Sequence, residues 1–201
     1  GGIEMAPFRL EKFDGEVELS GRTIGIRNAQ ADFFGGKVAG TLDAVLTADP
    51  SYEFQGRFDR VNLAQLGHSV SFLNNRASGT ASATLSIAAH GIGRENLVRS
   101  MEGNGTLTAR NAELRGFDFN GVFPGDNQNP SLSRFASVQG AFRIQSGGID
   151  LANVVIDHSR GRLQAEGRIE FSHTVNLRIR PSILRAATSP AGASPSSFLV
   201  T

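Results

Sequence analysis

The sequence predicts a mainly β protein: a long, curved antiparallel β-sheet that forms a half-tube or groove, with one or two short helices at strand ends. Three observations predict this fold class. Apolar and polar residues alternate over long runs, which is typical of strands with one covered face. The 201 residues include 24 glycines, well above average usage, without the proline enrichment of a collagen or a disordered linker. Helix signals are sparse.

The strands follow from the alternation. Residues 36–46 and 52–58 form a predicted hairpin, joined by an Asp-Pro turn signal. The longest run, Ala77 to Ala89, keeps one phase throughout and as a strand would span roughly 40 Å. Residues 161–171 repeat the pattern, and residues 175–180 are the predicted hairpin partner of that run.

Three further strands change phase at an asparagine: Asn28, Asn111 and Asn153. A slip of one residue is what a β-bulge or a tight turn produces, and asparagine tolerates the backbone geometry that either requires. The spacings suggest a repeat of about 42 residues, although no matching asparagine lies near position 70.

Short helices and loops complete the predicted domain. Residues 62–67 begin with the N-cap candidate Asn62 and end at a glycine, and residues 94–101 have apolar side chains on one side, enough for two turns. Composition predicts a loop over residues 117–132. We expect one groove domain over residues 1–180 and a Ser/Pro/Ala-rich tail over 181–201, with one closing strand at its end.

Composition excludes several classes of protein. The 20 basic and 19 acidic residues give no bulk field to attract nucleic acid or an anionic membrane. The absence of cysteine excludes disulfides and thiolate zinc sites. No window is apolar enough to span a membrane, and the opening residues do not form a signal peptide. We expect a fragment or a mature domain, with room for an anchor or signal before Gly1.

No motif predicts catalysis or metal binding. The four histidines lack the spacing of a metal site, no G-x-S-x-G is present, and the carboxylates occur mostly singly on polar strand faces. The glycines Gly91 and Gly93 precede a helix, but Asn96 occupies the place of the third glycine of a dinucleotide fingerprint. We therefore expect no enzyme, no catalytic residue, no metal and no cofactor.

The apolar strand face is the remaining candidate site. The aromatic residues are fourteen phenylalanines, one tyrosine and no tryptophan, and the phenylalanine side chain is pure hydrocarbon. These side chains either fill a closed core or form an incompletely covered concave face, because the strands are long and the helices are too short to cover them. The second interpretation predicts a binding surface for something apolar and elongated. Its candidate lining residues are Leu42, Phe54, Phe58, Leu85, Ile87, Leu107, Leu163, Ile169, Leu177 and Ile179.

A family resemblance rests on five stretches in a fixed order. They are FFGGKVAGTL (33–42), GRFDRVNLAQLG (56–67), NNRASGTASATLSIAAHG (74–91), LVRSMEGNGTLTARNAELRGFDF (97–119) and FASVQGAFRIQSGGIDLANVVIDHSRGRLQAEGRIEF (135–171). Together they resemble the C-terminal part of the AsmA-like family of bacterial envelope proteins, over most of the chain. Members are usually tethered to the inner membrane by an N-terminal helix. The large ones look like periplasmic bridges whose β-groove carries phospholipid toward the outer membrane.

The resemblance implies a non-enzymatic periplasmic module that binds or transfers lipid in outer-membrane biogenesis, tethered to the inner membrane in the full-length protein. Its expected partners are phospholipid or another acyl-chain lipid, other envelope proteins, and a membrane contacted through a region outside this fragment. A structural or protein-interaction β module of the envelope is the alternative, and it predicts that the ten candidate positions are tightly buried. A hydrolase acting on envelope polymers would need paired carboxylates across a cleft, which the sequence does not show.

Overall fold

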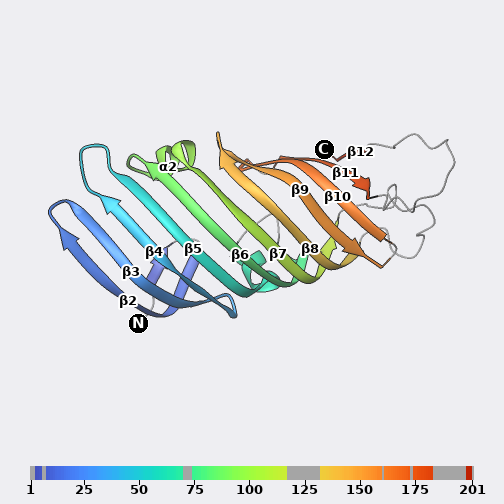
Figure 1. Ribbon diagram of the computed structural model, residues 1–201, viewed down its shortest axis with the longest axis horizontal. Helices are drawn as coiled ribbons and strands as arrows, with labels where there is room; N and C mark the ends of the chain where they lie inside the picture. Colours follow the sequence, from blue (N-terminus) through green and yellow to red (C-terminus); the bar gives the residue numbers. More distant parts are fainter. Residues whose placement is uncertain are drawn as a thin grey trace.

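A single meandering sheet forms the described part of the protein. The computed structural model describes residues 3–5, 8–69, 74–116, 132–159, 161–172, 174–182 and 198–200. Within them, twelve strands lie side by side in sequence order, and each pairs antiparallel with its neighbours. The sheet is open, because the first and last strands do not pair with each other. Figure 1 shows the long strands β2 to β11 side by side, with the short helices at strand ends.

The strands are β1 (Ile3–Met5), β2 (Phe8–Ser20), β3 (Thr23–Phe33), β4 (Gly36–Val45), β5 (Ser51–Asn62), β6 (Ala77–His90), β7 (Glu102–Arg115), β8 (Leu132–Gln145), β9 (Gly148–His158), β10 (Gly161–Glu170), β11 (Val175–Pro181) and β12 (Phe198–Val200). The predicted fold class is confirmed. Both predicted hairpins, β4–β5 and β10–β11, are paired as expected. The closing strand at the C-terminal end is β12, which pairs with β11. Residues 117–131 of the predicted loop and residues 183–197 of the predicted tail lie outside the described residues.

The predicted phase slips are β-bulges. Asn28, Asn111 and Asn153 have φ angles of 49°, 49° and 53°, in the left-handed region that asparagine tolerates better than most residues. The strand register shifts beside each of them. Lys12 and Arg60 adopt the same backbone conformation in β2 and β5, where no asparagine marks it. The bulges therefore occur at unequal intervals along the chain and do not follow a 42-residue repeat.

Both helices lie at strand ends. Helix α1 (Leu63–Ser69) begins after Asn62, whose Oδ1 accepts hydrogen bonds from the backbone N–H groups of Ala64 and Gln65 at 3.0 and 3.1 Å. This is the predicted N-cap, which satisfies donors that the first turn leaves free. Helix α2 (Arg94–Ser100) contacts β6 and half-buries Leu97 and Val98.

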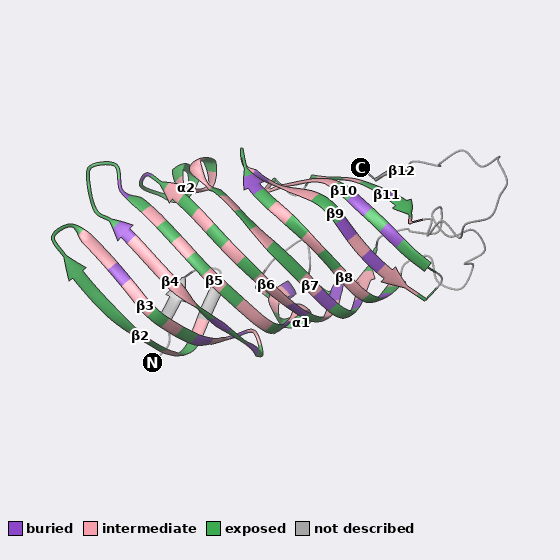
Figure 2. Ribbon diagram, viewed as in Figure 1, coloured by how far each residue is buried: buried purple, intermediate pink, exposed green. Residues whose placement is uncertain are grey.

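Buried side chains gather in two clusters on one face of the sheet. Figure 2 marks the buried residues along the strands. The larger cluster lies on β6 to β11 and includes Leu163, which is fully buried, with Phe135 and Ile179. The smaller lies on β3 to β5 and includes Phe33 and Val61. Leu63 of α1 packs on the larger cluster and Leu66 on the smaller. Helix α1 thus contributes to both clusters.

Burial predicts that two leucines of this face contribute very differently to the free energy of unfolding. Leu163→Ala should lower the free energy of unfolding by about 3 kcal/mol, because it empties a packed site. Leu107→Ala should lower it by less than about 1 kcal/mol, because Leu107 is 36% exposed. Urea unfolding of the two variants beside the parent protein measures both. Equal losses would show that the two positions are packed alike.

Candidate functional site: the apolar face of the sheet

The strand register places apolar residues in rows that cross the sheet. Directly paired residues of antiparallel strands project to the same face. One row starts at Ile26 in β3, ends at Val175 in β11, and has an apolar residue or a glycine at each step: Ile26, Leu42, Phe54, Ile87, Gly103, Ile144, Ile149, Ile169 and Val175. Eight steps of about 4.8 Å between strands make this row roughly 38 Å long.

All ten predicted lining residues lie on this face. Leu42, Phe54, Ile87 and Ile169 belong to the row just described. The other six lie in parallel rows on the same face: Leu85 and Leu177; Phe58, Leu107 and Ile179; and Leu163. The structure therefore brings together positions from β4 to β11 that are far apart in the sequence.

Exposure separates the ten residues into groups. Leu163 and Ile179 are 0% and 4% exposed and belong to the larger buried cluster, as a closed core would have them. Leu107 is exposed, and the other seven are partly exposed. A ligand on this face would contact the partly exposed side chains, while Leu163 and Ile179 support the sheet from within the cluster.

Glycines and larger apolar residues share the neighbouring row. Gly40, Gly56, Gly105 and Gly167 align with Leu85 and Leu177 across the sheet. A side chain at Gly40 or Gly167 would overlap a carbonyl oxygen of the adjacent strand. The ring of Phe54 lies over Gly56, and that of Phe142 lies over Gly105. The glycines thus allow the close approach of backbone and rings on the apolar face.

Charged side chains occupy the opposite face in ion pairs between neighbouring strands. Arg168 donates hydrogen bonds to Asp150 at 2.9 Å and Glu170 at 2.5 Å, and to the backbone carbonyls of Gln145 and Ser146. The hydrogen bond from Arg168, followed by one from Gln145, lowers the pKa of Asp150 below its ordinary value. On this face Arg168 ties the β8–β9 turn to β10.

A similar pair lies between β3 and β4. Arg27 donates two hydrogen bonds to the carboxylate of Asp43, at 2.9 and 2.5 Å. They lower the pKa of Asp43. The carboxylates of both pairs are thus held ionised by fixed guanidinium groups, which suits a solvated structural face rather than proton transfer.

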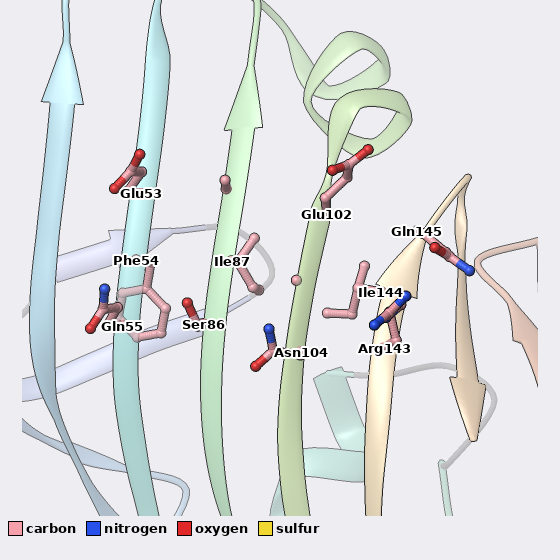
Figure 3. A pocket seen from close by; sticks show the side chains of 12 residues that line it. Glu53, Phe54, Gln55, Ser86, Ile87, Glu102, Asn104, Arg143, Ile144 and Gln145 are labelled. Atoms are coloured by element: carbon pink, nitrogen blue, oxygen red, sulfur yellow. The ribbon is translucent and has the colours of Figure 1, made fainter. Parts of the chain in front are cut away.

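A shallow hollow of about 390 Å³ crosses β5 to β8 (Figure 3). Each strand contributes three consecutive residues, and the middle ones, Phe54, Ile87, Gly103 and Ile144, belong to the apolar row. The flanking side chains are mostly polar and include Glu102. No group of three or more metal-ligating side chains occurs among the described residues. Because side chains alternate along each strand, the polar side chains that flank the four middle residues project to the opposite face of the sheet.

The structure extends the face beyond the predicted residues. Val17 and Leu19 of β2 pair with Ile26 and Ile24, so they lie on the apolar face, and they are 66% and 74% exposed. β2 is not among the strands predicted from the sequence, although the alternation of Glu16, Val17, Glu18 and Leu19 is the signal that identifies it. The apolar face therefore reaches the edge of the long strands.

Comparison of the chain with protein-family models, curated proteins and solved structures finds no match. No helix in the described part of the chain is long and apolar enough to cross a membrane.

The contact between Arg168 and Asp150 predicts a local change in titration. Because the lowered pKa means that Asp150 stabilises the fold when ionised, this contribution is present at neutral pH and is lost as pH falls through the folded-state value. Arg168→Gln should raise the pKa of Asp150 toward the ordinary value, measured by NMR titration of the carboxyl carbon. Asp157, whose partners are Ser137 and Arg162, is the internal control and should not change. An unchanged Asp150 would contradict the assigned contact.

Proposed function

We propose that this chain is a non-enzymatic lipid-binding module that holds acyl chains on the apolar face of its sheet. The observation that carries the proposal is the continuous apolar row from Ile26 to Val175, most of whose side chains are only partly covered. A soluble domain seldom leaves a long apolar surface unoccupied, because such a surface promotes association. An acyl chain is a ligand of matching chemistry and shape.

The energetics favour a chain-like ligand. Each CH₂ group removed from water contributes about 0.8 kcal/mol, so affinity grows with the length of row that the ligand covers. The lining side chains are hydrocarbon, which offers no partner for a polar headgroup. The headgroup would therefore remain at the margin of the face, in water.

The resemblance to the AsmA-like family extends this proposal to a biological setting. Stretches such as FFGGKVAGTL (33–42) and NNRASGTASATLSIAAHG (74–91) are its basis. By that resemblance, the lipid is a phospholipid, the compartment is the periplasm, the full-length protein is tethered to the inner membrane, and the process is outer-membrane biogenesis.

A structural or protein-interaction module of the envelope is the second candidate. The observation that favours it is the larger buried cluster, in which Leu163 and Ile179 are packed as in a closed core. The two candidates differ at the partly exposed residues, which a lipid would contact and a purely structural module would leave empty.

Mass spectrometry of an organic extract of the purified protein separates the two candidates. The lipid proposal predicts acyl-chain lipid in the extract at a fixed ratio to protein. A protein that carries no lipid and takes up none from phospholipid vesicles would support the structural module instead.

A matched pair of variants tests where the lipid lies. Leu85→Arg should reduce the lipid-to-protein ratio at least tenfold, because a charge on the apolar face costs more than about 1.4 kcal/mol of binding. Ser86→Arg, one residue along β6, projects to the polar face and should retain the lipid. Leu163 does not suit this test, because an arginine at a fully buried position would disrupt the cluster. Circular dichroism checks that both variants keep the sheet, and equal lipid content in the two would place the lipid elsewhere.

A further inference from the structure

The outer edge of β2 is open over half of its length. β1 pairs only with Phe8 to Leu10, whereas residues 14–20 have β3 on one side and no strand on the other among the described residues. Such an edge presents unpaired backbone N–H and C=O groups that can pair with an added strand. In Figure 1, β2 and β11 lie toward opposite ends of the row of long strands.

The side chains of this edge define the strand that would complement it. On β2, Val17 and Leu19 project to the apolar face, and Glu16 and Glu18 project to the polar face. On β11, Leu177 and Ile179 lie on the apolar face, and Arg178 and Arg180 lie on the polar face. The two strands have the same alternation of apolar and charged residues, with opposite charge.

The pairing of β10 with β11 already contains this combination of opposite charges on one face and apolar residues on the other. β11 pairs with β10, where Glu166 lies opposite Arg178 and is 2.6 Å from Arg180. On the apolar face of the same pair, Ala165 lies opposite Ile179. A strand that places a glutamate on the polar face and small or aliphatic residues on the apolar face is therefore a partner that β11 accepts.

Strand direction permits the contact between two copies. Directions alternate along the meander, so β2 and β11 run in opposite directions. A second copy placed head to tail would therefore pair β2 antiparallel to β11 and keep both apolar faces on the same side. A twofold contact of β2 with β2 would instead place Glu16 and Glu18 of one copy next to Glu16 and Glu18 of the other. Like charges on opposed strands are destabilising.

We propose that the edge of β2 is a docking site for β11 of a second copy of this chain, which joins the two sheets and extends the apolar face. The contact is heterologous and repeats from copy to copy. β12 pairs only with Leu177 to Ile179 and must leave that edge. The proposal rests on strand edges and charge and does not depend on lipid.

A charge exchange tests the docking. Glu16→Arg with Glu18→Arg makes both edges basic, and Arg178→Glu with Arg180→Glu makes both acidic, so each variant alone should lose the self-association of the parent protein. Mixing the two variants should restore it, because each then meets an edge of opposite charge. Sedimentation velocity over a concentration series up to about 1 mM measures the association, and circular dichroism checks the fold.

Cysteine pairs test the same contact if the acidic variant fails to fold. The chain contains no cysteine, so Glu18→Cys and Arg178→Cys introduce single thiols. Oxidation of their mixture should give a disulfide-linked dimer at least tenfold faster than oxidation of Glu18→Cys alone. Removal of residues 198–201, which include β12, should strengthen the association of the copies, because β12 then no longer occupies the edge of β11.

Several results would overturn the proposal. A parent protein that stays monomeric over the series excludes a second copy as the occupant. Association that survives both charge reversals assigns it to another surface, and cross-linking of Glu18→Cys with itself assigns it to a twofold contact of β2. Association that disappears when lipid is extracted, while the fold is retained, shows that lipid joins the copies.

Discussion

Antiparallel backbone pairing in one consistent register is the constraint on which the structure depends. Because side chains alternate with a period of two, a register that matches apolar positions across neighbouring strands makes one face of the sheet apolar from β2 to β11. A slip of one residue would move the apolar set of a strand to the charged face. The ion pairs of that face, such as Arg27 with Asp43 and Arg168 with Asp150, join neighbouring strands in the same register. Both faces therefore favour one alignment.

Curvature arises from bulges and glycines within this register. Each bulge inserts a residue with positive φ, at Asn28, Arg60, Asn111 and Asn153 among others, and a bulge bends its strand and increases its twist. The glycine row allows the backbone and the rings of Phe54 and Phe142 to approach closely on the apolar face. Two-residue turns, such as the one at Gly35 and the one at Gly147, and this row account for part of the high glycine content.

Local patterns predicted most of the fold, because strands, bulges and hairpins here involve sequence neighbours. The alternation identified the long strands, and asparagine identified three bulges. Arg60 and Lys12 were not recognised, since their backbone conformation depends on strand pairing rather than on their own preference. The alternation within each strand predicted the face to which each lining residue projects. It did not predict how exposed that residue is. Leu163 and Leu107 show the same alternation in sequence. Leu163 is nevertheless buried in a cluster with residues far away in the sequence, such as Ala81 and Phe135, whereas Leu107 is 36% exposed.

The energetic consequence of an open face differs between its middle and its edge. Apolar surface in water costs about 25 cal/mol per Å², and partly exposed side chains such as Phe54 and Ile87 recover that energy when a hydrocarbon ligand covers them. Val17 and Leu19 at the edge add unpaired backbone groups to their exposed surface, and hydrocarbon cannot satisfy those groups. Only another strand supplies both hydrogen bonds and apolar contact there. The middle of the face therefore suits an acyl chain, whereas the edge of β2 suits a polypeptide.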